Sequence, residues 1–146
     1  MARRLSRGFT LLELLVVAAI IALGTAAVSL SLRDAGQTRL EREALRLTAL
    51  LEAARAYSRA SGVAVRWLPT AEGFRFSGWR GHDQAQRWLN PETHSQANVT
   101  LSLGPEPMLE PQFVQLGLTD SPAQSLRIAT DGLRPFAVRD AAALTP

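Results

Sequence analysis

A run of 19 residues without a charge, from Leu14 to Leu32, constrains this chain more than any other feature. A helix of that length can cross the apolar part of a bilayer. One acid, Glu13, directly precedes the run, and an acid placed at the centre of a membrane costs about 2.5–3.5 kcal/mol on insertion scales. Because a polar group is expensive in an apolar segment, Glu13 is a candidate functional residue.

A short basic leader precedes the apolar run, with three arginines between residues 3 and 7. An excess of arginine marks the cytoplasmic side of a membrane segment. We therefore expect a single-pass protein with its N-terminus in the cytoplasm and the rest of the chain on the other side. A cut after Gly8 would give Phe9 a new positive amine, one helical turn from Glu13.

The string Arg-Gly-Phe-Thr-Leu-Leu-Glu, residues 7–13, resembles the class III signal of type IV pilins and type II secretion pseudopilins. The resemblance implies that a membrane-embedded prepilin peptidase cuts between Gly8 and Phe9 and methylates the new N-terminus. It also implies that the apolar helix stays on the mature protein, in the bacterial inner membrane, and that Glu13 acts in filament assembly.

An ordinary secretory signal is the alternative for the same segment. Such a signal is removed with its apolar part, and Gly24-Thr25-Ala26 provides a small-x-small cleavage site. The mature chain would then begin near Ala27. A secretory signal has no use for Glu13 at the start of its apolar run, which favours the pilin-like interpretation.

Composition excludes several other classes of function. Removal of the basic leader leaves 13 arginines against 13 acids, so the basic pI is no argument for a nucleic-acid partner. The chain has no cysteine, which excludes disulfides, thiolate metal sites and thiol nucleophiles. We expect no enzyme activity, no cofactor and no metal, and we read the two histidines, His82 and His94, as bystanders in a polar loop.

Beyond the apolar run, the sequence predicts that the helix continues as an amphipathic segment, residues 33–60, with Gly36 as a possible bend. Apolar residues recur at spacings of three and four, which is typical of a helix packed on a core. This stripe comprises Leu40, Ala44, Leu47, Leu50, Leu51, Ala54 and Tyr57. The charged residues are expected on the other faces, with Glu52 and Arg55 or Arg59 as solvated surface pairs. Ser61-Gly62 should end the helix.

The remainder, residues 61–146, reads as β-rich. Alternating patterns predict strands at 63–68, 74–79 and 99–103, a weaker strand at 113–118, and a last pair at 126–128 and 136–138. Turn signals lie near Pro69–Gly73 and at Asp131-Gly132. Residues 80–97 are expected to be irregular, with Trp88 and Leu89 against the sheet. The order of elements predicts an α+β fold in which a long N-terminal helix packs on an antiparallel sheet or sandwich.

We therefore expect a leader at 1–8, a transmembrane and assembly helix at 9–32, its amphipathic continuation at 33–60, and a periplasmic domain at 61–146. The pattern from Glu43 to Arg55, the Ser61-Gly62-Val63 entry and the string from Leu126 to Gly132 resemble the GspH/FimT group. Thr130 stands where that group usually has proline.

The resemblance leaves two functions open. GspH-type proteins are minor pseudopilins of type II secretion, and FimT-type proteins are minor pilins of type IV pili, some linked to DNA uptake. Either implies prepilin peptidase, other major and minor pseudopilins or pilins, and an inner-membrane assembly platform as partners. The balanced charge favours type II secretion, because DNA binding needs a basic stripe. The candidate arginines for such a stripe are Arg66, Arg75, Arg80 and Arg87. A stacking groove for DNA remains possible, built from Arg75, Arg80 and Arg87 with Trp79 and Trp88.

Overall fold

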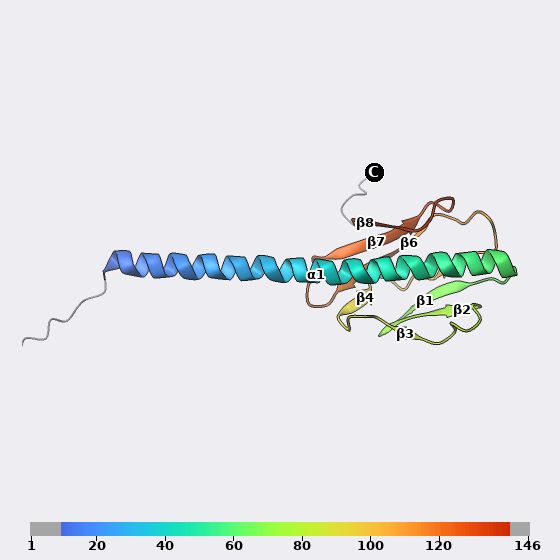
Figure 1. Cartoon of the computed structure of the whole chain (residues 1–146), viewed down its shortest axis with the longest axis horizontal. Coiled ribbons are helices and arrows are strands. Elements are labelled where there is room, and N and C mark those ends of the chain that lie inside the picture. Colours follow the sequence, from blue (N-terminus) through green and yellow to red (C-terminus); the bar gives the residue numbers. More distant parts are fainter. Residues whose placement is uncertain (1–9, 141–146) are drawn as a thin grey trace, which may run out of the picture. The chain divides into compact units, whose positions relative to one another are not determined.

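The computed structural model describes residues 10–140, except for the side chains of residues 26–34 and 140. It shows the expected α+β fold, an N-terminal helix packed on antiparallel sheets (Figure 1). The chain divides into two compact units, Met1–Ala35 and Gly36–Pro146. The elements are the helix α1 (Leu11–Ser61) and the strands β1 (Arg66–Thr70), β2 (Gly73–Ser77), β3 (Gln86–Arg87), β4 (Thr93–Ser95), β5 (Leu101–Ser102), β6 (Gln112–Leu118), β7 (Ser125–Thr130) and β8 (Ala137–Asp140).

The helix ends where the sequence predicts. Gly62 has a positive φ of 69° and its N–H donates to the Ser58 carbonyl at 2.9 Å. Glycine adopts this left-handed conformation without the steric cost that a Cβ brings, which makes it the usual residue after a helix. The Ser58 hydroxyl also donates to the Val63 carbonyl at 2.6 Å, so the chain leaves the helix in a fixed direction.

The apolar stripe of the second half of α1 is confirmed. Its central side chains are fully buried, and Leu50 and Tyr57 are packed against the same cluster while partly exposed. The fully buried members are Leu40, Ala44, Leu47, Leu51 and Ala54. Side chains three and four apart share one face of a helix, which explains why the periodicity alone found them.

Two charged residues of α1 contradict the prediction that charges lie on solvated faces. Glu43 is 0 % exposed and Arg55 is 2 % exposed. The Glu43 carboxylate accepts hydrogen bonds from Arg46 at 2.8 Å and from the Leu89 N–H at 2.6 Å. A buried charge is tolerated only with such partners, so Glu43 and Arg46 connect the helix to the loop after β3.

Arg55 connects the helix to a second loop, between β7 and β8. Its guanidinium donates to the carbonyls of Gly132 at 2.7 Å and Arg134 at 3.2 Å. The neighbouring Glu52 accepts from the Phe136 N–H at 2.8 Å and lies 3.9 Å from Arg55. The expected surface pair is therefore a partly buried clamp.

The strands form two four-stranded antiparallel sheets. The first has the order β3-β2-β1-β5 and the second has the order β4-β6-β7-β8. The side-chain amide of Gln112, at the start of β6, pairs with both backbone polar groups of Ser102 in β5, at 3.0 and 2.5 Å. That amide takes the place of a backbone partner and joins the two sheets.

Several strand bounds differ from the predictions. Residues 63–65 precede β1, and the hairpin turns at Ala71-Glu72, with Pro69 inside the strand. Strand β5 is only two residues long. The segment expected to be irregular contributes two short edge strands, β3 and β4. Such short strands carry too few residues for an alternating pattern to show in the sequence.

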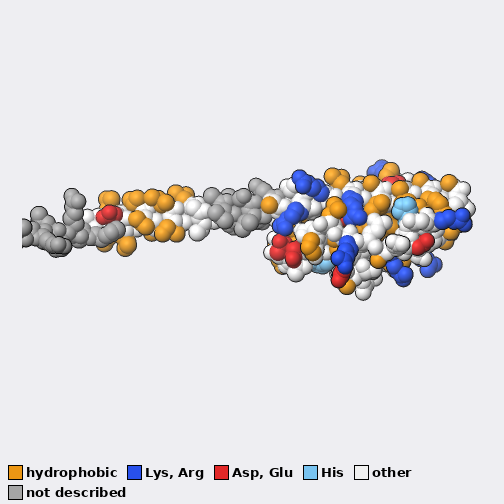
Figure 2. Space-filling view, turned by 60° about the horizontal axis from the view of Figure 1, so that its bottom comes forward, with side chains coloured by type: hydrophobic (Ala, Val, Ile, Leu, Met, Phe, Trp, Pro, Cys, Tyr) orange, Lys and Arg blue, Asp and Glu red, His pale blue; other side chains and the backbone are white. Residues whose placement is uncertain are grey.

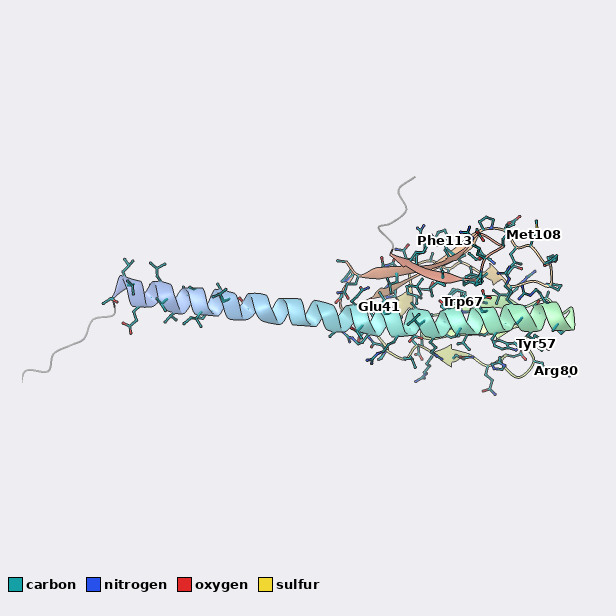
Figure 3. All side chains as sticks on the ribbon, turned by 45° about the horizontal axis from the view of Figure 1, so that its top comes forward. Glu41, Tyr57, Trp67, Arg80, Met108 and Phe113 are labelled. Carbon is teal, nitrogen blue, oxygen red and sulfur yellow. The ribbon has the colours of Figure 1, made fainter. Side chains whose placement is uncertain are left out.

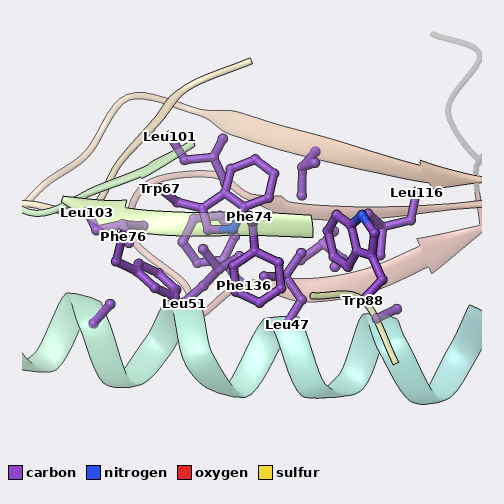
Figure 4. Packing of buried hydrophobic residues seen from close by; sticks show 14 of the residues in the cluster. Leu47, Leu51, Trp67, Phe74, Phe76, Trp88, Leu101, Leu103, Leu116 and Phe136 are labelled. Atoms are coloured by element: carbon purple, nitrogen blue, oxygen red, sulfur yellow. The ribbon is translucent and has the colours of Figure 1, made fainter. Parts of the chain in front are cut away.

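The core fills the space between α1 and the sheets with aromatic and aliphatic side chains (Figure 4). Trp67, Phe74 and Phe76 project inward from the β1–β2 hairpin and are at most 1 % exposed. Phe74 contacts Trp88 with ring centroids 5.0 Å apart. Trp88 is buried as predicted, whereas Leu89 is 65 % exposed.

Gly36 has a packing role that the sequence did not reveal. The position lies within the continuous helix α1, and a Cβ there would meet the side chain of Gln124, with Leu118 next to it at 3.5 Å. The absence of a Cβ thus leaves room for the end of the Gln124 side chain against the helix.

Candidate functional site

The expected processing site, Gly8 and Phe9, lies outside the described residues. Glu13 is described, and it stands in the first turn of α1 with an exposed side chain. An acid in the first turn is favourable because the helix N-terminus carries partial positive charge. The exposed Glu13 carboxylate is therefore open to a partner.

Thr10 is a residue of this region that the sequence analysis missed. Its hydroxyl accepts a hydrogen bond from the Glu13 N–H at 3.2 Å, and its carbonyl accepts from the Leu14 N–H at 3.2 Å. Thr10 is therefore the N-cap of α1. The pattern Thr-x-x-Glu before an apolar run is the recognisable sequence signature of such a cap.

Apart from Glu13, the large described side chains at the start of α1 are apolar and exposed. Between residues 11 and 23 the exposed fractions of the large ones range from 43 % for Val17 to 77 % for Leu11. They are Leu11, Leu12, Leu14, Leu15, Val16, Val17, Ile20, Ile21 and Leu23 (Figure 3). Apolar surface of this extent marks a segment that lipid or another apolar surface covers.

Among the described residues, no helical segment combines the length and the hydropathy that a membrane span requires. The expected span from Leu14 to Leu32 runs into residues 26–34, whose side chains lie outside the description. The span therefore stays a prediction.

The two histidines lie in separate places. His82 stacks on Trp79 with ring centroids 3.8 Å apart, and His94 in β4 has its Nδ1 3.5 Å from the Thr119 hydroxyl. Within residues 10–140, no group of three or more histidines and acids is arranged to hold a metal ion. His82 thus has a stacking contact with a core aromatic, and His94 has a polar contact with a neighbouring segment.

The arginines expected to form a basic groove lie partly on one face. Arg66 pairs with Ser77 across β1 and β2, Leu68 pairs with Arg75, and Gly73 pairs with Arg87 across β2 and β3. Directly paired residues project to the same side of a sheet, so Arg66, Arg75 and Arg87 all project from the outer face of the first sheet. All three are exposed.

These three arginines follow a diagonal, which we call the arginine diagonal. Each step moves one strand across and two residues along, so that consecutive Cα atoms are about 8 Å apart by standard sheet spacings. Arg87 has an ion pair with Glu72 at 3.2 Å, both side chains well exposed. In the described part of the chain, Arg66 and Arg75 have no ion-pair partner.

The two tryptophans do not line an exposed stacking groove for DNA, so that part of the alternative is wrong. Trp79 is 8 % exposed and Trp88 is 5 % exposed. Trp79 is covered by His82 and contacts Phe76, with ring centroids 5.0 Å apart. Bases stack on exposed aromatic faces, and these two faces belong to the core. Arg80 lies in the turn after β2, outside the diagonal (Figure 3).

A groove of about 490 Å³ lies beside the two-sheet junction. Its walls include Ser102 of β5 and the loop between β5 and β6, which contributes Glu106, Met108 and Glu110. Met108 is 68 % exposed (Figure 3). Both acids are exposed and lack an ion pair among the described residues, so the groove is acidic with an apolar contact point.

A search of curated proteins and a search of solved structures each found no match to this chain. Residues 3–29 match the family model described as the prokaryotic N-terminal methylation motif. That segment contains the basic leader, Gly8, Phe9 and Glu13. The motif implies processing by prepilin peptidase and assembly with other pilins, and it indicates a structural subunit rather than an enzyme. The chain therefore carries the prepilin signal of type IV pilin-like proteins.

Proposed function

We propose that the chain is a minor pseudopilin of the type II secretion system. In this role it is a structural subunit of the periplasmic pseudopilus, at or near the tip, and helps to export folded proteins across the outer membrane. The observation that carries the proposal is the prepilin signal at residues 3–29 on a helix that continues into an α+β domain. That combination supplies an anchor, an assembly helix and an exposed domain in one chain.

The proposed life cycle follows from the same segment. The chain enters the inner membrane as a single-pass protein with residues 1–8 in the cytoplasm and residues 33–146 in the periplasm. Prepilin peptidase cuts between Gly8 and Phe9 and methylates Phe9. The assembly platform then transfers the helix from lipid into a bundle with other pseudopilins, where apolar side chains of one subunit replace lipid around the next.

Glu13 would fix the register of that bundle. In lipid the Glu13 carboxylate loses its hydration and has no partner there, which is costly for a polar group. In the bundle it can approach the amine of Phe9 on a neighbouring subunit, and opposite charges attract strongly where the dielectric constant is low. Desolvation offsets much of that gain, so the pair specifies position more than it adds stability.

The alternative is a minor pilin of a type IV pilus that acts in pilus assembly or DNA uptake. The exposed arginines of the first sheet favour it, because phosphate contacts come from such side chains. The burial of Trp79 and Trp88 argues against the stacking part of a nucleic-acid groove. The acids beside the first sheet also weaken a phosphate-binding face.

Deletion of the gene, with complementation by the intact chain, separates the two functions. The proposal predicts loss of secreted proteins from the medium with normal pili and normal DNA uptake. Retained secretion with lost pili or lost uptake would replace the proposal by the pilus alternative.

A further inference from the structure

The outer side of the first sheet carries the arginine diagonal, and the acidic groove lies next to its edge strand β5. Arg66 of β1 pairs directly with Ser102 of β5, and Ser102 lines the acidic groove. The arginine diagonal therefore begins one strand away from the groove that contains Glu106 and Glu110. Figure 2 shows one face of the domain, on which positive and negative side chains are both spread over the surface.

We propose that this side of the domain is a contact between two copies of the chain, in which the acidic loop of one copy, Glu106 to Glu110, lies on the arginine diagonal of the other. The proposal goes beyond the filament function. It rests on that function only because a shared filament or membrane brings the copies close together.

Charge complementarity selects this partner. A nucleic acid needs positive charge along its whole track, and the acids of the neighbouring groove would repel its phosphates. A protein surface with a matching acidic strip meets the arginines favourably, and each copy of this chain carries such a strip. Each copy carries both the arginine diagonal and the acidic loop. Two copies can therefore make both contacts at once, or the contact can repeat from one copy to the next.

The groove adds an apolar element to the contact. Met108 is 68 % exposed between the two acids, and a flexible thioether adapts to irregular surfaces. On the diagonal, Leu68 is half-buried directly beside Arg75. A second copy would cover both side chains. The charges would then orient the two copies, and the burial of apolar atoms would stabilise the contact.

Such a contact is weak in dilute solution. Exposed ion pairs mainly determine association rate and specificity, and they are screened beyond about 8 Å at physiological salt. Confinement in one membrane or filament supplies the effective concentration that the contact itself lacks. The contact should therefore be sought in membranes that hold the full chain.

The absence of cysteine in the chain makes disulfide mapping clean. Two differently tagged full-length copies, one with Arg66→Cys and one with Glu106→Cys, are produced together and their membranes are mildly oxidised. The proposal predicts a disulfide-linked dimer that carries both tags. The matched control pairs Glu106→Cys with Arg59→Cys, an exposed arginine in the last turn of the helix, and should give little product.

Charge reversal tests the cause of the contact. Arg75→Glu on the Arg66→Cys copy should lower the dimer yield about tenfold, because like charges then face each other. Glu110→Arg on the other copy should restore the yield. A mixed-tag yield no higher than the Arg59 control, or one that charge reversal leaves unchanged, would overturn the proposal. The proposal would also be overturned if the chain with the unchanged Arg75 retained DNA and formed no mixed-tag dimer.

The same membranes separate failure of the contact from failure of the proposed function. The mass of the protein reports processing after Gly8. A processed chain without the mixed-tag dimer refutes the contact alone. An unprocessed chain with the dimer refutes the pilin-like function and upholds the contact.

Discussion

The guanidinium of Arg55 donates a 2.7 Å hydrogen bond to the carbonyl of Gly132, 77 residues away in the sequence. It joins the helix to the loop between β7 and β8. Gly132 has a φ of 89°, and a Cβ there would clash with the carbonyl of Leu109. The Thr130 hydroxyl donates to the Arg134 carbonyl at 2.6 Å and accepts from the Gly132 N–H at 3.0 Å, so this loop is fixed from two sides.

Replacing Arg55 should destabilise the domain. Arg55→Leu removes two charge-assisted hydrogen bonds from a buried place, and we expect a loss of about 1–3 kcal/mol in the free energy of unfolding. Chemical denaturation of the isolated domain, residues 33–146, measures it. Arg59→Leu, on the exposed side of the same helix, is the matched control and should change stability by no more than about 0.5 kcal/mol. Equal effects of the two variants would contradict the clamp.

The loss of folding stability at low pH should depend on Asp131. The backbone N–H groups of Arg134 and Leu133 donate to its carboxylate and lower its pKa from the ordinary value. A lowered folded-state pKa contributes stability above the unfolded-state pKa, and that contribution is lost as pH falls through the folded-state pKa. Asp131→Ala should therefore be less stable than the parent at neutral pH, with the difference vanishing in strong acid. A difference that persists unchanged in acid would refute this role.

The domain should fold without its anchor. Among the residues whose side chains are described, the buried hydrophobic ones of the core lie between Leu40 and Phe136, so residues 33–146 contain this cluster. We expect this fragment to be monomeric in dilute solution, to unfold cooperatively, and to be insensitive to reductant because it has no cysteine. Circular dichroism should show both helix and strand. A mostly disordered or purely helical spectrum would contradict the fold.

Periodicity predicts much of this fold because burial follows it directly. The stripe from Leu40 to Ala54 and the alternation in β2 follow from local spacing alone. The burial of Glu43 and Arg55 does not, because their partners, Leu89 and Gly132, come from loops far along the chain. A charged residue at the edge of an apolar stripe looks solvated until such a loop covers it.

The candidate sites also divide into those that local sequence reveals and those that only the fold reveals. The basic leader, the expected cleavage dipeptide and Glu13 form one continuous string, so the sequence alone suffices to predict them. The arginine diagonal needs the register of three strands, which no local pattern fixes. The sequence left Trp79 and Trp88 open to a stacking groove, because an aromatic next to an arginine is compatible with either a core or a binding face.

Substitution of Glu13 should separate processing from assembly. Glu13→Ala should still be cut after Gly8 and methylated, but should fail to enter the filament or its tip, with loss of secretion. Leu12→Ala, which keeps the carboxylate and shortens a neighbouring exposed side chain, is the matched control and should assemble. Normal incorporation of the processed Glu13→Ala chain would show that the acid serves only peptidase recognition.

The intact mass of the protein from bacterial membranes tests the central claim most directly. The account predicts a mature chain that begins at N-methylated Phe9 and retains the apolar run. It further predicts that Gly8→Val blocks the cut, because the peptidase needs a backbone without a side chain there, while Gly24→Val, at a position with open space, leaves it intact. A mature chain that begins near Ala27 would mean a secretory-type cut and would contradict the pilin-like account.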